Sequence, residues 1–146
     1  MVILALDVGS RRIGVAVSDP TGLLASSRPV IHRQSLTQAV QAVAAAVQRE
    51  AAEQVLVGLP LTLDGEVGPQ AKETLVFIEH LTPLLTVPVL TWDERYTTVQ
   101  AAAALRAQGI RHARQRERID SAAAAVLLQH YLDTQRTATA GQGNAS

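Results

Sequence analysis

Residues 2–18 read VILALDVGSRRIGVAVS, and this stretch decides the fold class. Its first half is a continuous apolar run over residues 2–6 that ends at Asp7, and its second half alternates apolar and small residues from 13 to 18. A short apolar run predicts a buried strand, and the alternation after a Gly-Ser turn predicts its antiparallel partner. Residues 23–31 follow a second turn and supply a third antiparallel strand.

The rest of the chain alternates between helical and strand patterns. Ser35 and Gln38 have the spacing of a capping box, which begins a helix that runs to about Ala52. Strands separated by helices run parallel, so we predict an α/β fold whose mixed sheet of about five strands, three antiparallel and then two parallel, is flanked by helices. The further predicted strands are residues 54–59 and 87–92, and the further predicted helices lie within 65–81, 98–108 and 119–133.

Length and composition indicate a single domain. The chain has 146 residues, 47% of them hydrophobic, and its apolar runs are too short to cross a membrane. We expect no secretion signal, and the absence of cysteine excludes disulfides and a thiol nucleophile, so a cytoplasmic protein is expected. Residues 1–133 form the expected domain, and the tail 134–146, which has almost no large apolar side chains, is expected to be disordered.

The basic residues are grouped, although the formal net charge is zero. Most of them are arginines, which bind phosphate oxygens in a bidentate manner, so the two groups are compatible with a polyanionic partner. A solvated arginine-rich loop is an equally good interpretation of the larger group. The smaller group is Arg11 and Arg12, and the larger one comprises Arg106, Arg111, Arg114, Arg116 and Arg118.

Three acids stand where chemistry is expected, and each also has a structural interpretation. Asp7 ends the first strand, where it would alternatively cap the following turn. Glu94 follows the strand 87–92, where the alternative is a solvated turn in which Arg95 neutralises Glu94. Asp120 stands at the start of the last helix, on the side expected to face the sheet, where the alternative is helix capping.

A hard divalent cation accounts for all three acids at once, because carboxylates and waters are the ligands that Mg²⁺ and Mn²⁺ prefer. The predicted strand order raises one difficulty. If the strand 54–59 lies between those carrying Asp7 and Glu94, their backbones are about 10 Å apart, at ~4.8 Å per strand. Gly58 in that strand would leave room for ions and substrate phosphate, and Glu94 has the longer side chain to cross the gap.

Four sequence segments together indicate a family. They are Ala5–Ser10 with Ile13–Ala16, Val57–Leu61 with Asp64 and Gly65, Asp93–Thr98, and Ile119–Ala124. In this order they resemble the YqgF family, also called RuvX, which includes proteins assigned as Holliday junction resolvases and as pre-16S rRNA nucleases. The resemblance extends over nearly the whole chain except the tail.

The resemblance implies a ribonuclease H-like nuclease in which Asp7, Glu94 and Asp120 bind Mg²⁺ or Mn²⁺, with two ions expected, and hydrolyse phosphodiester bonds. Its partner would be nucleic acid, either the 5′ end of pre-16S rRNA or branched or single-stranded DNA, and the protein would be a monomer or homodimer. Nucleic-acid contacts are expected from Arg11, Arg12, Arg95, Arg111, His112, Arg114, Arg116 and Arg118.

Two departures from the family pattern affect the expected substrate contacts. Thr62 replaces an asparagine that is common in the Gly-Leu-Pro segment. Arginines replace a lysine that often stands shortly before the position of Asp120, so positive charge is retained while the phosphate geometry changes.

Two other function classes stay open. One is a nucleic-acid-binding ribosome-assembly factor without activity. The other, less favoured, is an actin-like or sugar-kinase phosphotransferase, a class that duplicates the Asp-x-Gly hairpin which this chain contains once. Trp92, Tyr96 and Tyr131 could stack on bases, although core packing is the better prediction for them.

Overall fold

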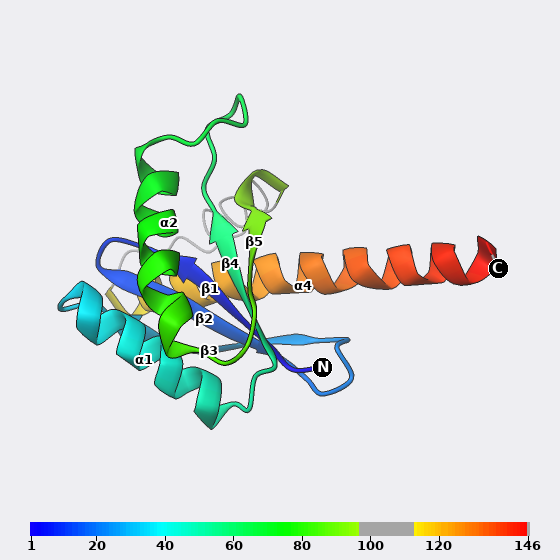
Figure 1. Ribbon diagram of the computed structural model, residues 1–146, viewed down its shortest axis with the longest axis horizontal. Coiled ribbons are helices and arrows are strands. Elements are labelled where there is room, and N and C mark those ends of the chain that lie inside the picture. Colours follow the sequence, from blue (N-terminus) through cyan, green and yellow to red (C-terminus); the bar gives the residue numbers. More distant parts are fainter. Residues whose placement is uncertain (97–112, 146) are drawn as a thin grey trace.

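One mixed sheet organises the computed structural model, which describes residues 1–96 and 113–145, with side chains described for 1–95 and 121–138. The strand order is β3-β2-β1-β4-β5 (Figure 1). β1, β2 and β3 are antiparallel neighbours, whereas β4 runs parallel to β1 and β5 runs parallel to β4. This confirms the predicted sheet. The strands are β1 Ile3–Val8, β2 Arg12–Ser18, β3 Ala25–His32, β4 Gln54–Leu59 and β5 Val89–Asp93.

Helices cover both faces of the sheet. α1 (Leu36–Arg49) and α2 (Pro69–Leu81) lie on one face, and α4 (Ala113–Ala145) lies on the other and projects beyond it (Figure 1). α1 begins as predicted, because the Ser35 hydroxyl accepts a hydrogen bond from the Gln38 N–H at 3.0 Å. Short 3₁₀ turns, η1 and η2, follow α2 and β5 at Thr82–Leu84 and Glu94–Tyr96.

Side chains of the central strands alternate between the two layers. Leu4 and Leu6 of β1 pack on the α1 and α2 side, whereas Ile3 and Ala5 pack on the α4 side. This burial of both faces explains why the first strand is a continuous apolar run. Because alternate residues share a face, Asp7 continues the series of Ile3 and Ala5 and belongs to the α4 face.

α4 is longer at both ends than the sequence predicted. It begins at Ala113, so residues 113–118 of the expected arginine-rich loop are helical, and it continues to Ala145 through the tail expected to be disordered. The residues of 113–118 are alanine, arginine, glutamine and glutamate, all good helix formers. Once a helix is nucleated, residues that make no tertiary contacts can extend it. A prediction based on apolar side chains does not detect such an extension.

The predicted helix 98–108 lies outside the described residues. Among the described residues, no helix combines the length and the apolar character that crossing a membrane requires.

Candidate active site at the carboxyl edge of the sheet

Two of the three predicted acids meet at the carboxyl ends of the parallel strands. Asp7 on β1 is paired in register with Gly14 of β2, and Gly58 near the end of β4 is paired with Trp92 of β5. Glu94 follows Trp92 by two residues and so shares its face of the sheet. Asp7, Gly58 and Glu94 therefore lie on the face that α4 covers.

Gly58 provides the space in which the two acids approach each other. A Cβ atom added at Gly58 would lie 2.8 Å from the Glu94 Cγ and 2.5 Å from the Leu127 Cδ1, which is closer than packed atoms allow. The Glu94 side chain thus crosses the intervening strand directly over the glycine. The backbones that carry Asp7 and Glu94 are separated by about two strand spacings, and the Glu94 side chain spans this distance. The same side chain fills the space at Gly58 that was predicted to hold ions and substrate phosphate.

A hydrogen bond joins the carboxyl groups of Asp7 and Glu94. Burial, followed by the charge of Asp7, the hydrogen bond to Asp7 and the charge of Asp93, raises the pKa of Glu94 to about 9. One proton is therefore held between the two acids at neutral pH. Paired acids of this kind provide oxygen ligands for a hard cation, which would take the place of the proton.

Arg95 does not neutralise Glu94, so that alternative is wrong. Its guanidinium pairs with Asp93, with Nη2 at 2.6 Å from Oδ2 and Nε at 2.9 Å from the same oxygen. The hydrogen bonds and the charge of Arg95 hold the pKa of Asp93 below its ordinary value. Arg95 was expected to contact nucleic acid, and in the structure it pairs with Asp93 while its side chain stays about one-third exposed, at 35%.

The third acid, Asp120, lies in α4, the helix that covers this face. It is the eighth residue of the helix, four positions before Ala124 and seven before Leu127, both of which pack against the sheet. The helix-capping alternative required Asp120 in the first turn, and a helix that begins at Ala113 contradicts it. The side chain of Asp120 is outside the described set, and no metal-binding group of three residues is found among the side chains within it.

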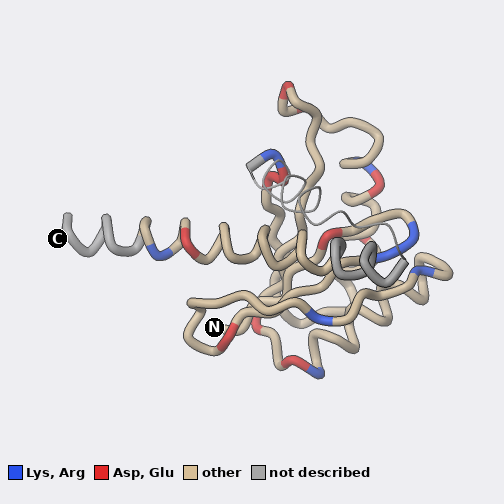
Figure 2. The backbone as a smooth tube through the Cα atoms, turned by 180° about the vertical axis from the view of Figure 1, so that it is seen from behind, with Lys and Arg blue, Asp and Glu red and all other residues tan. Residues whose placement is uncertain are grey.

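Two of the predicted basic residues, Arg11 and Arg12, lie at this edge. Arg11 is exposed in the turn that joins β1 to β2, and Arg12 begins β2, close in sequence to Asp7. Figure 2 shows basic positions, in blue, at this turn. Arg114, Arg116 and Arg118 belong to the first turns of α4, without described side chains. Arg106, Arg111 and His112 lie outside the described residues.

Sequence reasoning missed Arg33. Its Nη1 donates to the Gly9 carbonyl at 2.7 Å, its backbone N–H donates to the Arg11 carbonyl at 2.9 Å, and its guanidinium lies 5.3 Å from the centre of the Phe77 ring. These contacts brace the turn after Asp7. A lone arginine after a strand belongs to no motif and to neither basic group, so the sequence carried no signal for it.

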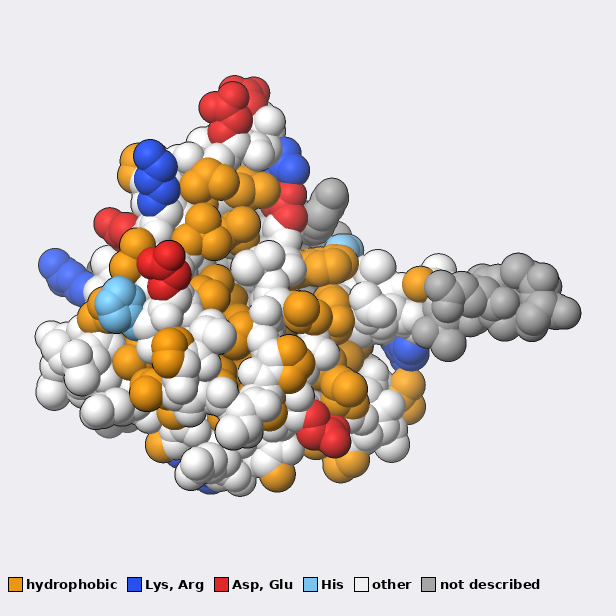
Figure 3. Space-filling view, in the orientation of Figure 1, with side chains coloured by type: hydrophobic (Ala, Val, Ile, Leu, Met, Phe, Trp, Pro, Cys, Tyr) orange, Lys and Arg blue, Asp and Glu red, His pale blue; other side chains and the backbone are white. Residues whose placement is uncertain are grey.

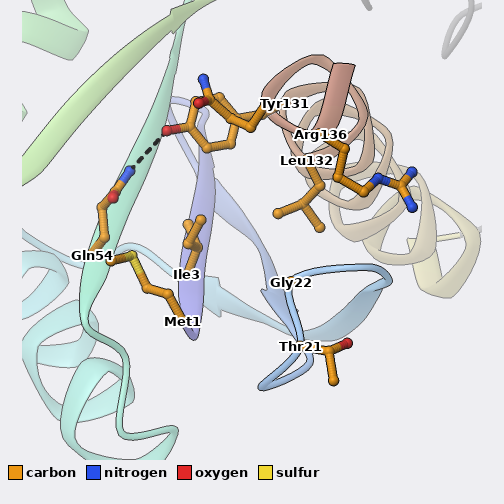
Figure 4. Close-up of a pocket in the computed structure, with 9 residues that line it drawn as sticks. Met1, Ile3, Thr21, Gly22, Gln54, Tyr131, Leu132 and Arg136 are labelled. Carbon is orange, nitrogen blue, oxygen red and sulfur yellow. Dashed lines mark hydrogen bonds between the residues drawn. The ribbon is translucent and has the colours of Figure 1, made fainter. Parts of the chain in front are cut away.

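Trp92 and Tyr131 are used for packing, as predicted. Their rings meet edge to face at 5.2 Å, and the Tyr131 hydroxyl accepts a hydrogen bond from the Gln54 Nε2 at 3.3 Å. Figure 4 shows Tyr131 and Gln54 at the side of a groove of about 610 Å³ between α4 and the amino ends of β1 and β4. The groove contains none of the predicted site residues and lies at the opposite end of the sheet from Asp7.

Comparison with known structures supports the fold. The structure of T. thermophilus RuvC in complex with a Holliday junction substrate has a TM-score of 0.57 and 17% identity, covering 93% of this chain and 96% of that one. The Fowlpox virus resolvase in complex with Holliday junction DNA has a TM-score of 0.57 and 14% identity, covering 92% and 99%. At these identities the likeness establishes the ribonuclease H-like fold.

Sequence comparison gives the family. Residues 1–134 match the family described as "RuvX: Holliday junction resolvase". A Roseiflexus sp. (strain RS-1) protein named "Putative pre-16S rRNA nuclease" is 42% identical over 134 residues, which is 92% of this chain and 95% of that protein. A Synechococcus sp. (strain JA-3-3Ab) protein with the same name is 47% identical over 133 residues, 91% and 84% of the two chains. The chain therefore belongs to the RuvX family, also called YqgF.

Proposed function

We propose that this protein is a divalent-metal-dependent nuclease that hydrolyses phosphodiester bonds in nucleic acid, with Asp7, Glu94 and Asp120 as its catalytic, metal-binding acids. The observation that carries the proposal is the contact between Asp7 and Glu94 across Gly58. Burying two acids against each other costs folding free energy, and perturbed acids of this kind are typical of functional sites. Family membership indicates a nuclease, and the acid pair supplies residues suited to that chemistry.

The donor set fits Mg²⁺ or Mn²⁺. Both ions favour carboxylate oxygens, and a cation relieves the repulsion that otherwise keeps a proton on Glu94. Asp7 and Glu94, with Asp120 from the covering helix, would hold two such ions. When bound, the ions lower the pKa of a water molecule and stabilise negative charge on a phosphate group.

The protein's own residues then bind and orient the substrate. Arg11 and Arg12 lie at the turn after Asp7, which Arg33 braces, so Arg11 and Arg12 are suited to holding phosphates next to the acids. On the other side, Leu127 packs over Gly58 and limits the access of water behind Glu94. Arg114, Arg116 and Arg118, in the first turns of α4, would extend the phosphate contacts. We propose phosphate contacts for Arg111 and His112 as well.

The 5′ end of pre-16S rRNA is the first candidate substrate, because relatives above 40% identity carry the name of a pre-16S rRNA nuclease. A Holliday junction is the second, because the family description names that activity. The two differ in the assembly they require. Symmetric cleavage of a junction needs two active sites and hence a dimer, whereas trimming of an RNA end needs one.

The test presents the purified protein with precursor 16S rRNA, a four-way DNA junction and single-stranded DNA, each with Mn²⁺, with Mg²⁺ and with chelator. We expect metal-dependent cleavage, fastest on the RNA precursor. Tight binding without cleavage of any substrate would assign the protein to the inactive assembly factors. Preferential cleavage of the junction by a dimer would replace the RNA substrate with branched DNA.

A further inference from the structure

Arg95 makes an unusually complete set of contacts for a half-exposed arginine. Its Nε lies 3.1 and 2.9 Å from the two carboxylate oxygens of Asp93, and its Nη2 lies 2.6 Å from Oδ2. The backbone N–H of Arg95 also donates to the Asp93 Oδ1 at 2.9 Å. The side chain and the backbone N–H of Arg95 thus both bind the Asp93 carboxylate. These contacts close the turn around Glu94, which lies between Asp93 and Arg95. Bidentate geometry of this kind is what makes an exposed ion pair stabilising.

The far side of the guanidinium rests on the loop between β4 and α2. Its Nη1 donates to the Leu63 carbonyl at 3.4 Å, and a Cβ added at Gly65 would lie 2.9 Å from the same Nη1. Gly65 has a φ of +83°, so a side chain is disfavoured there by the backbone as well as by Arg95. The guanidinium therefore fits a site that only glycine leaves open.

This loop has its own hydrogen bonds, which make it a firm support. The Thr62 N–H donates to the Glu66 carbonyl at 2.9 Å, and the Gly65 N–H donates to the Thr62 carbonyl at 2.8 Å. The Thr62 hydroxyl accepts from the Glu66 N–H at 3.0 Å. Thr62, which departs from the family pattern, thereby closes the turn itself. Acidic side chains gather at the tip of the loop, where phosphates would be repelled (Figure 3).

From these contacts we propose that Arg95 is a positioning residue: by gripping Asp93 and resting on residues 62–66, it locks the turn that carries Glu94 opposite Asp7. The inference rests on the proposed function of the Asp7 and Glu94 pair. Asp93 is the last residue of β5, and Glu94 and Arg95 belong to the 3₁₀ turn η2, so the contacts of Arg95 with Asp93 and with the Leu63 carbonyl hold the backbone on both sides of Glu94. Acids that are to bind a cation together need their backbones held in place, and the contacts of Arg95 supply this for Glu94.

Two glycine substitutions isolate this role. Gly65→Ala and Gly22→Ala both place an alanine at a positive φ, +83° and +73°, so both carry a similar backbone cost. The added Cβ meets Arg95 at Gly65, whereas nothing lies within 4 Å at Gly22. The difference between the two variants therefore reports displacement of Arg95. Arg95→Ala, a change at the surface, serves as the second variant and avoids the backbone cost altogether.

The readouts are hydrogen exchange of the segment 93–96 and Mn²⁺ affinity by calorimetry, both independent of nuclease activity. We expect Gly65→Ala and Arg95→Ala to speed exchange in 93–96 at least about tenfold and to weaken Mn²⁺ binding, while Gly22→Ala matches wild type in both. Cleavage, where measured, should lose about 10- to 100-fold in kcat with KM nearly unchanged, as expected for a misplaced catalytic group.

Exchange and Mn²⁺ affinity of Gly65→Ala and Arg95→Ala equal to those of Gly22→Ala would overturn the positioning role, even with the wild-type protein fully active. A loss of substrate affinity confined to KM would also overturn it, since Arg95 would then be a substrate contact. Failure of the proposed function has a different result, because the wild-type protein would then not cleave nucleic acid with any metal. The hydrogen-exchange comparison would still test whether Arg95 holds the turn.

Discussion

Asp93 and Glu94 are adjacent in the chain, yet they occupy opposite electrostatic environments. Asp93 faces Arg95, whose hydrogen bonds and charge hold the pKa of Asp93 below its ordinary value. Glu94 faces Asp7 on the α4 side, where burial and a second acid raise its pKa to about 9. One side of the turn is an ion pair, and the other is a pair of acids. Residue type alone therefore does not distinguish a supporting acid from a reactive one. The group that each acid contacts makes this distinction.

The largest expected effect is on nuclease activity, which should depend more strongly on Glu94 than on its neighbour Asp93. Asp7→Asn and Glu94→Gln each remove a metal ligand at little cost in volume, so we expect cleavage to fall by at least about 1,000-fold in each. The double variant should be hardly slower than either single one, because residues that act on the same ions are not additive. Asp93→Asn should retain measurable cleavage. Single-turnover rates with melting temperatures for all four proteins provide the measurement, and equal losses at positions 93 and 94 would contradict the distinction.

The next prediction tests whether Asp120 is a metal-binding acid, as proposed for Glu94, or a supporting acid, as Asp93 is. As the eighth residue of α4, Asp120 is too far from the helix start to act as a cap. Asp120→Asn should therefore lose cleavage by about 100-fold or more, as expected for a lost anionic ligand, with a melting temperature near that of wild type. Ser35→Ala is the comparison, since it removes an observed cap and should destabilise by about 1 kcal/mol without affecting cleavage. Cleavage by Asp120→Asn near the wild-type rate would remove it from the site.

The sheet and the acids on its edge were predictable because their signals are local. The apolar run of β1, the alternation of β2 and the capping spacing at Ser35 each correspond to a physical period or motif, and the structure confirms all three. Placement of acids directly after strands followed from the rule that parallel strands end at one edge.

The contacts around those acids could not be predicted, because they depend on residues distant in sequence. Arg95 donates to the Leu63 carbonyl, which lies 32 positions earlier in the chain. Arg33 reaches Gly9 and Phe77 through the folded chain. The true start of α4 escaped detection because helix formers without an apolar stripe resemble a polar loop.

A smaller effect separates Asp93 and Glu94 by pH. Glu94 in the folded, metal-free protein keeps its proton up to about pH 9, whereas an unfolded glutamate loses it near 4.5. Between these values the native state binds more protons than the unfolded state, so the free energy of unfolding falls as the pH rises, by an amount on the order of a few kcal/mol. Asp93, with its lowered pKa, acts in reverse: its contribution is present above its ordinary pKa and is lost as the pH falls.

Denaturant titrations from pH 3 to pH 10 in chelator measure both limbs. Glu94→Gln should flatten the decline on the alkaline side, and Asp93→Asn should flatten the decline on the acid side. Added Mn²⁺ should also restore stability at pH 8 in wild type, because a ligand that binds the native state alone stabilises it. A decline between pH 5 and 9 that survives in Glu94→Gln would assign the effect to another group.

The smallest expected effect tests the geometry that brings Glu94 to Asp7. Gly58→Ala places a Cβ 2.8 Å from the Glu94 Cγ and 2.5 Å from the Leu127 Cδ1, so one of these side chains must move. No positive φ is involved, and the cost is therefore one of packing, about 1–3 kcal/mol of unfolding free energy. Gly68→Ala is the matched control, because its Cβ would meet only the Thr62 Cγ2, at 3.1 Å, with an ordinary φ of −86°.

Displacement of Glu94 should slow cleavage in Gly58→Ala. The contacts of Arg95 with Asp93 should persist, and protection of residues 62–66 from hydrogen exchange should stay at the wild-type level. Retention of both stability and cleavage in Gly58→Ala would mean that Glu94 reaches Asp7 by another path, and the contrast between the two sides of the turn would then lose its geometric basis.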